Sequence, residues 1–354
     1  MIKNTTDLLR AMKSRIKWLL LGIGIIWITH TLLDTQQSKH GNWHKQSWQS
    51  LYTKINLTIE GDTVDVAKAI RQLDVFFESF TLQFQTGSRL DSTFRASKQG
   101  DTVMVDSLAW ELLQFAENSY KESQGVIHPG VGSLLRAWGL EWGLTPAVPN
   151  DSILEQEKNK LKKLFYQTLP NQKSVLILQD SGTIALGAFS KGFAMDVAKE
   201  KLSALKLDNY LLEIGGDLLY SGKNPRGKDW LIAITDPDQK NGQLFALHLP
   251  PEFNAMATSG GYERFFQDST GAKHHHILNP VTAKSSTGTK STTVFAKTAA
   301  EADMLATWLF VEGTELAKQW ETAKKVATVV VPEEGDLYLS PSLLPRKVDL
   351  ETKK

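Results

Sequence analysis

Apolar residues in this chain switch repeatedly between two periodicities, and this switching constrains the fold most. Residues 52–59 alternate with period two, which predicts a strand, whereas 64–80 show the apolar spacing of a helix that Asp62 and Thr63 can cap. The same criteria predict helices over 107–119, 152–165, 193–205 and 299–311, and strands over 174–179, 210–214, 230–234, 292–295 and 326–331. Both kinds of element follow one another irregularly with many hairpin turns, so the predicted class is α+β and not doubly wound.

Composition narrows the chemistry that such a domain can carry. The 354 residues contain no cysteine, which excludes disulfides, thiolate nucleophiles and cysteine-ligated zinc. An apolar fraction of 41% and a charged fraction of 22% are typical of a folded globular chain. Lys and Arg number 40 against 39 Asp and Glu, so no global field attracts nucleic acid, and we expect no nucleic-acid partner.

The first residues show a charge asymmetry that predicts export. Residues 1–17 are basic and precede an uncharged, largely apolar stretch at 18–33. Positive charge before an apolar segment holds that flank in the cytoplasm, so the remainder is expected on the other side. The stretch is shorter than the roughly 20 residues that span a bilayer comfortably, which leaves a cleaved signal peptide as the alternative to a transmembrane signal anchor. We favour the anchor because no small-x-small cleavage site follows the stretch.

The chain therefore divides into four predicted parts. A cytoplasmic N-terminus covers 1–17, a membrane segment 18–33 and a polar tether 34–47. One folded domain is expected over 48–354, because we find no internal repeat or low-complexity tract that would divide it. The expected location is a bacterial cytoplasmic membrane, with the domain facing the periplasm or exterior.

Three glycine-containing clusters carry groups suited to phosphate chemistry. Glycines at 128–139 and at 186–196 precede predicted helices, where backbone N–H groups can approach a phosphate. Lys191 lies in the second of these turns, without the spacing of a P-loop lysine. The third cluster, 213–217, ends in Gly-Gly-Asp after a predicted strand, and the two leucines that follow rule out a diguanylate-cyclase motif. Taken singly, each cluster is better explained as a structural turn.

Two further clusters carry groups suited to proton transfer and metal binding. Residues 258–266 are followed by His274, His275 and His276, which cannot all face one metal ion because neighbours on a strand alternate sides. A single histidine presented to a substrate could accept a proton near neutral pH. Asp303 and Thr307 are four residues apart on a predicted helix and so share a face. A carboxylate beside a hydroxyl suits a hard cation such as Mg²⁺.

In order and spacing together, the five clusters resemble the FAD:protein FMN transferase (ApbE) family over about residues 55–331. The marks are Val131-Gly132 with Trp138-Gly139, the run 190–196, Ile214-Gly215-Gly216-Asp217, Thr258-Ser259-Gly260 with Tyr262-Glu263-Arg264, His275-His276-Ile277, and Glu301-Ala302-Asp303 with Thr307. The resemblance implies a single ApbE-type domain that binds FAD and Mg²⁺. It also implies cleavage of the FAD pyrophosphate, transfer of FMN to a Ser or Thr hydroxyl of a partner redox protein, and release of AMP.

The resemblance further implies which residues form the site. FAD contacts are implied at Phe84, Val126, Ile127, His128, Ala185, Lys191 and Ile277. Metal ligands are implied at the side chains of Asp303 and Thr307 and at the main-chain oxygens of Ala188 and Ala306. His276 corresponds to a histidine considered for catalysis, and it is our candidate base for the acceptor hydroxyl. On the assumption that the Asp303 carboxylate is exposed, we expect Asp303→Ala to abolish turnover and to leave the fold intact.

The chain departs from the family pattern at several cofactor contacts. Ala185 stands where the family usually has the Asp of Asp-Leu-Gly-Gly, and His128 where it commonly has the Asp of Phe-Asp-x-Thr-Val-Gly. Phe84 keeps the ring of a frequent tyrosine without its hydroxyl. Two alternatives therefore stay open. One is a periplasmic protein that binds FAD or hydrolyses its pyrophosphate without transfer activity, and the other is a docking subunit of a membrane assembly.

Overall fold

The computed structural model describes residues 41–349, except 85–86, 142, 171–172, 181 and 240–241. The predicted segments 1–17 and 18–33 and the first part of the predicted tether lie outside these residues, so the anchor and the location stay predictions. Among the helices that are described, none is both long and apolar enough to cross a membrane.

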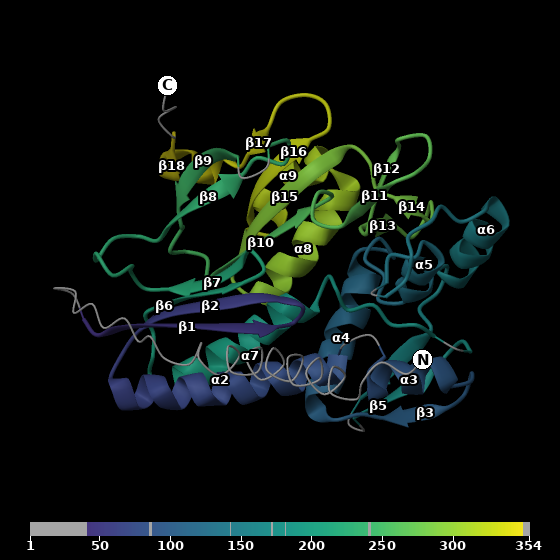
Figure 1. Cartoon of the computed structure of the whole chain (residues 1–354), viewed down its shortest axis with the longest axis horizontal. Helices are drawn as coiled ribbons and strands as arrows, with labels where there is room; N and C mark the ends of the chain where they lie inside the picture. The colour runs from purple at the N-terminus through teal and green to yellow at the C-terminus, as the bar shows by residue number, and fades with distance from the viewer. Residues whose placement is uncertain are drawn as a thin grey trace, which may run out of the picture. The chain divides into compact units, whose positions relative to one another are not determined.

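An antiparallel sheet of eight strands forms the centre of the domain (Figure 1), in the order β1-β2-β6-β7-β10-β15-β16-β17. Its strands are β1 (Trp43–Ser50), β2 (Thr53–Glu60), β6 (Tyr210–Ile214), β7 (Asp217–Ser221), β10 (Ala255–Gly260), β15 (Thr289–Ala296), β16 (Ala327–Pro332) and β17 (Tyr338–Leu339). All seven pairings between neighbours are antiparallel. The predicted α+β class is confirmed, because helices cover an antiparallel sheet that hairpins build in large part.

Each face of this sheet is buried by a different core. Leu219 of β7 belongs to the larger core, which includes residues of α2 (Thr63–Phe84), α7 (Ser190–Ala204) and α8 (Ala299–Glu312). Its neighbours Leu218 and Tyr220 belong to a second core with β8 (Leu231–Thr235) and β9 (Gln243–His248). Successive side chains of a strand point to opposite faces, so one unbroken apolar run serves both cores.

Local capping fixes where two of the covering helices begin. Asp62 accepts a hydrogen bond from the N–H of Val64 at 2.8 Å, as expected for the start of α2. Thr298 caps α8 through the N–H of Glu301 at 3.2 Å. Helix α8 packs against α7 as well as against β10 and β15, which explains why its sequence is apolar on nearly every side.

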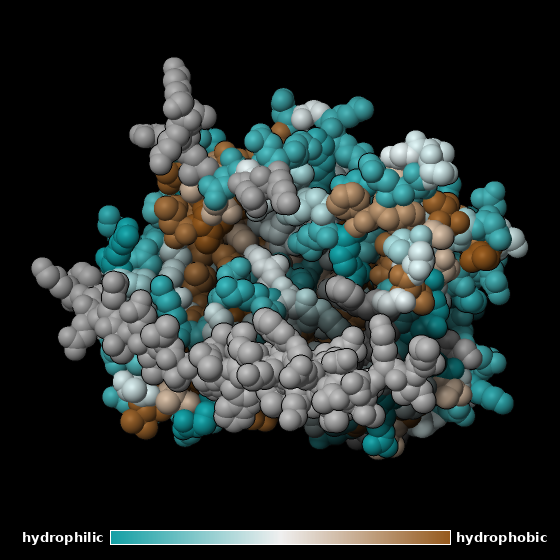
Figure 2. All heavy atoms as spheres, in the orientation of Figure 1, coloured by the Kyte–Doolittle hydropathy of each residue, from teal (hydrophilic) through white to brown (hydrophobic). Residues whose placement is uncertain are grey.

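Smaller units complete the domain beside the main sheet. Leu231, Leu344 and Val348 are exposed hydrophobic residues. Hydrophobic residues also gather on the left of the face that Figure 2 shows. A third core, including Phe94, joins the sheet β3-β5-β4 to α3 and α4. The remaining elements are β3 (Thr102–Met104), β4 (Tyr166–Leu169), β5 (Ser174–Ile177), α3 (Arg89–Ala96), α4 (Ser107–Glu122), α5 (Gly132–Ala137), α6 (Asp151–Lys160), α9 (Thr314–Ala323), β11 (Phe265–Gln267), β12 (Lys273–His275), β13 (Leu278–Asn279), β14 (Lys284–Ser285), the 3₁₀ helix η1 (Pro341–Arg346) and β18 (Lys347–Val348).

Two predicted boundaries are wrong. The domain does not begin at residue 48, because β1 pairs with β2 along its whole length and Trp43 packs against Trp230 with ring centroids 5.9 Å apart. This edge strand is mostly polar, and its sequence therefore resembled a tether. The helix predicted over 152–165 ends at Lys160, because Leu161 packs into one core and Phe165 into another.

Candidate functional site

A buried cluster of charged side chains lies where α7, β7 and α8 come together. Lys191, in the first turn of α7, donates hydrogen bonds to Asp217 of β7 and to Oδ1 of Asp303 of α8, the latter at 3.1 Å. The second oxygen of Asp303 accepts from the N–H of Gly192 at 3.0 Å, and that of Asp217 from the N–H of Thr258 at 2.8 Å. Both carboxylates are therefore held by a main-chain N–H as well as by one shared ammonium.

The burial of this cluster corrects one expectation. The Asp303 carboxylate was expected to be exposed, but only 3% of the residue is accessible to solvent. Its charge is thus balanced inside the protein by Lys191 and by the N–H of Gly192. Removing the carboxylate altogether would leave both donors unpaired, so Asp303→Ala is expected to weaken the fold as well as the site.

The cluster holds more acidic than basic groups. Burial raises the pKa of Asp217 to about 7, against the attraction of Lys191. Burial acts against the Lys191 ammonium too, yet the charges of Asp217 and Asp303 outweigh it and raise the pKa of Lys191 above its ordinary value. The two pKa shifts are compatible. The Lys191 ammonium is stabilised by two carboxylates, whereas the two carboxylates have only this one ammonium between them. Glu263, whose pKa burial also raises, is a further acidic group that interacts electrostatically with Lys191, Asp303 and Arg264.

Hydroxyl and carbonyl groups extend the cluster along α8. The Oγ1 atom of Thr307 lies 3.1 Å from Ser259 Oγ of β10 and 3.3 Å from the carbonyl oxygen of Asp303. Asp303 and Thr307 thus lie one turn apart on the same helix, as predicted. The carbonyl oxygen of Ala306 accepts a hydrogen bond from Thr292 at 2.7 Å. Its predicted role as a metal ligand, like that of the half-buried Ala188 just before α7, stays a prediction.

The donor set suits magnesium better than zinc. Among the described residues, no group of three or more His, Cys, Asp or Glu side chains is arranged to hold a metal ion. Mg²⁺ commonly takes only one or two carboxylates from a protein and fills its other positions with water or phosphate oxygens. The carboxylate of Asp303, the hydroxyl of Thr307 and the surplus of acidic groups around them therefore fit Mg²⁺.

The three adjacent histidines have three different partners. His274 hydrogen-bonds Asp268 at 2.9 Å, and His275 Nε2 lies 2.9 Å from the carbonyl oxygen of Ser286. His276 follows β12, and its Nδ1 lies 3.2 Å from the carbonyl oxygen of Arg264. The three rings therefore face three different partners, as the alternation of side chains along a strand predicts.

His276 is held with one ring nitrogen able to accept a proton. A carbonyl oxygen can only accept, so Nδ1 carries the proton in the bond to Arg264 and Nε2 keeps a lone pair. Burial and then the charge of Arg264 lower the pKa of His276 to about 3. The ring is therefore neutral at physiological pH but only weakly basic in the free protein.

The predicted FAD contacts lie on segments that the fold ties together. The N–H of Ala185 donates to the carbonyl oxygen of Pro129 at 2.7 Å, which joins the turn before α7 to the segment containing Val126, Ile127 and His128. Phe84, at the end of α2, packs on Phe80 with ring centroids 4.5 Å apart. Ile277 is buried directly after His276. Their contacts with FAD stay predictions.

Sequence reasoning missed two members of the cluster. Gly215 and Gly216, with φ angles of 59° and 93°, make the tight turn between β6 and β7 and place Asp217 at the start of β7. Asp217 was assigned no role, although a carboxylate in an otherwise apolar buried strand was a signal that could have found it. Glu263 lay within a recognised cluster, but nothing in its local sequence indicated its distant partners Lys191 and Asp303.

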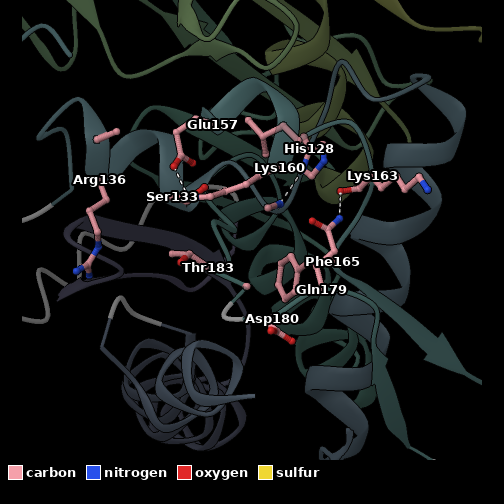
Figure 3. A pocket seen from close by; sticks show the side chains of 14 residues that line it. His128, Ser133, Arg136, Glu157, Lys160, Lys163, Phe165, Gln179, Asp180 and Thr183 are labelled. Carbon is pink, nitrogen blue, oxygen red and sulfur yellow. Dashed lines mark hydrogen bonds and ion pairs between the residues drawn. The ribbon is translucent and has the colours of Figure 1, made fainter. Parts of the chain in front are cut away.

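His128 lines a separate cavity of about 390 Å³ that α5 and α6 border (Figure 3). Its Nδ1 accepts a hydrogen bond from the N–H of Gly130 at 2.9 Å. Glu157 lines the same cavity and pairs with Lys160 at 2.5 Å. Burial lowers the pKa of His128 to about 4, so the ring is buried in its neutral form.

Replacing His128 by Gln should make the protein less sensitive to acid. The pKa of about 4 in the folded state lies below the ordinary 6.5, so the unfolded chain binds the extra proton between these values. Above pH 6.5, protonation of His128 takes nothing from the free energy of unfolding. As the pH drops towards 4, this protonation lowers the free energy of unfolding, by on the order of 2 kcal/mol at pH 5. Urea unfolding at pH 7.5 and pH 5 should show a smaller loss for H128Q than for the unmodified protein. Equal losses would contradict this assignment.

Solved structures show the class of fold to which this domain belongs. The ApbE protein of Thermotoga maritima superimposes with a TM-score of 0.77 at 24% identity, covering 87% of this chain and 100% of that one. The flavin transferase ApbE of Vibrio cholerae gives a TM-score of 0.75 at 24% identity, covering 86% of this chain and 99% of that one. At this level of identity the likeness concerns the fold.

The chain belongs to the ApbE family, because the family model matches residues 51–330. Two curated relatives are both called FAD:protein FMN transferase. The one from Rhodobacter capsulatus is 30% identical over 259 residues, which are 73% of this chain and 49% of that protein. The one from Treponema pallidum is 30% identical over 227 residues, which are 60% of this chain and 62% of that protein. The matches thus span less than two thirds of either relative.

Proposed function

We propose that this protein is a Mg²⁺-dependent FAD:protein FMN transferase. It would move FMN from FAD to a Ser or Thr hydroxyl of a partner flavoprotein and release AMP. The observation that carries the proposal is the buried cluster of Lys191, Asp217 and Asp303, with Thr307 beside it, in a chain of the ApbE family. The names of the curated relatives support the same activity.

Phosphoryl transfer requires mainly positioning and compensation of charge, which this cluster can supply. Asp303 and Thr307 would hold Mg²⁺, and the bound ion would stabilise negative charge on the pyrophosphate. Lys191 provides a positive charge beside the same carboxylate and would neutralise a further phosphate oxygen. The surplus of acidic groups in the cluster supports this placement, because a divalent cation would offset their charge.

His276 would accept the proton of the acceptor hydroxyl. The hydroxyl oxygen bonds to the phosphorus of the FMN half, the bridging P–O bond breaks, and AMP leaves with the electron pair. The released proton passes to Nε2 of His276, since Nδ1 is engaged by Arg264. The low pKa of this ring reflects burial and the nearby positive charge of Arg264, and a pyrophosphate beside it would raise that pKa.

A second candidate function is hydrolysis of FAD without transfer. It is favoured by Ala185 and His128, which stand where the family pattern has carboxylates. The lost carboxylates concern cofactor contacts, whereas Asp303 and Thr307 of the metal site are present. A protein altered in this way could keep the pyrophosphate chemistry and lose the productive placement of the flavin.

The products released from FAD separate the two functions. The purified chain is incubated with FAD and Mg²⁺, with and without a redox protein carrying an Asp-x-x-Ser/Thr-Gly/Ala acceptor motif, and AMP and free FMN are quantified. A transferase releases AMP much faster when the acceptor is present, with little free FMN. A hydrolase releases AMP and free FMN in equal amounts whether or not the acceptor is present, and that result would overturn the proposal.

We propose further that the domain acts outside the cytoplasmic membrane, tethered by residues 18–33. The support is the basic character of 1–17 before this uncharged stretch. Fractionation of expressing cells should place the full chain in the membrane fraction, accessible to protease only from the exterior. Recovery of the full chain in the cytosol would contradict the proposal.

A further inference from the structure

Lys191 and a bound cation would need the same carboxylate. The ammonium of Lys191 donates to Oδ1 of Asp303, and the N–H of Gly192 occupies Oδ2. A cation coordinated by Asp303 would therefore lie close to the Lys191 ammonium, and the two positive charges would repel each other in a buried site. Mg²⁺ at Asp303 thus favours a shift of the lysine contact to another carboxylate.

Asp217 is the group to which the lysine can shift. It already accepts a hydrogen bond from Lys191, and the N–H of Thr258 fixes its other oxygen at 2.8 Å. It is 2% exposed and lies at the first position of β7. A rigid, buried carboxylate in this place can retain the ammonium when Asp303 turns to the cation.

We propose that Asp217 is a positioning residue that sets the affinity of the site for Mg²⁺ by holding Lys191 away from the metal. Without Asp217, Asp303 becomes the remaining carboxylate that hydrogen-bonds the lysine, so ammonium and cation compete for it directly. Without Lys191, Asp303 is free of that competition. The inference rests on the proposed function for the location of the cation, but it concerns the binding of Mg²⁺ alone.

Opposite effects of two substitutions test this inference. Mg²⁺ binding to the purified full chain is measured by calorimetry in the absence of FAD and acceptor. D217N should weaken binding at least ten-fold, and K191M should strengthen it. Asn is nearly isosteric with Asp and keeps an oxygen for the N–H of Thr258, so the fold should survive, which a thermal melt verifies.

Glu263→Gln is the matched control for a simple loss of charge. Glu263 interacts with Lys191 and Asp303 through its charge, whereas the hydrogen bonds of Lys191 go to Asp217 and Asp303. If Asp217 acts by holding the lysine, D217N weakens Mg²⁺ binding far more than E263Q, and the difference disappears in the K191M background. Equal effects of D217N and E263Q would overturn the inference, as would absence of Mg²⁺ binding by the unmodified protein.

A crystal structure with Mn²⁺ gives an independent answer if D217N proves unstable. The anomalous signal of Mn²⁺ should lie at Asp303 and Thr307, with Lys191 in contact with Asp217 and no longer with Asp303. Coordination of Mn²⁺ by Asp217 itself would overturn the inference. Neither the calorimetry nor the crystal structure contains an acceptor protein. Both therefore still test the role of Asp217 if the transfer assay fails.

Discussion

Asp303→Asn should reduce Mg²⁺-dependent release of AMP from FAD by on the order of 10²- to 10³-fold, because a neutral amide cannot replace the charge that we propose holds the metal. Asn keeps an oxygen for the N–H of Gly192, so it disturbs the buried site less than Ala would. AMP is measured at saturating FAD over a Mg²⁺ titration, and raising Mg²⁺ should recover only part of the rate.

Glu301→Gln is the matched control for this substitution. Glu301 lies two residues before Asp303 on α8, but its electrostatic neighbours are Lys324, Glu122, Asp196 and Lys297. E301Q should keep the rate and its Mg²⁺ dependence close to those of the unmodified protein. Full activity of a folded D303N protein would show that Asp303 does not hold the metal. Equal losses of the rate of AMP release in D303N and E301Q would point to a general effect on α8.

Gly192→Ala should destabilise the domain by about 2 kcal/mol or more, because it overpacks the contact between α7 and α8. A Cβ atom at this position would lie 2.2 Å from the carbonyl oxygen of Ala299 and 2.5 Å from its carbon. Both are backbone atoms at the start of α8, so relief requires the helices to move apart. The same movement would pull the N–H of Gly192 from Asp303 and lower activity.

Gly187→Ala is the control for this effect, because a Cβ atom there meets no other atom within 4 Å. Chemical unfolding should show a change within about 0.5 kcal/mol for G187A, as for most surface substitutions. Comparable stability of G192A and G187A would show that α7 and α8 tolerate a wider separation than the structure implies.

Elements with strong periodicity were predictable from the sequence. The strand over 210–214 has the predicted bounds, and the helix over 299–311 is longer by one residue. Their signals are local, since apolar spacing and capping residues lie within the segment itself. The polar strand β1 was missed because an edge strand needs little apolar alternation when β2 already supplies the core face.

The site was predictable only in the part that lies within single segments. Asp303 and Thr307 share a helical face by spacing alone, whereas the contact between Lys191 and Asp217 joins residues 26 positions apart across a helix and a strand. The burial of Asp303 depends on how closely α7 approaches α8 at Gly192, which local sequence does not encode. Long-range packing therefore explains why Asp217 was not predicted as part of the site and why Asp303 was wrongly expected to be exposed.

Covalent attachment of FMN to an acceptor protein is the most direct test of transferase activity in this chain. The full chain, FAD and Mg²⁺ are incubated with a redox protein bearing the acceptor motif, and with its variant in which the motif Ser or Thr is replaced by Ala. We expect flavin fluorescence on the denatured acceptor, and a mass increase of one FMN less water, which chelation of Mg²⁺ and the Ala variant both abolish. An unmodified acceptor, with FAD converted to free FMN and AMP, would contradict transfer and establish hydrolysis in its place.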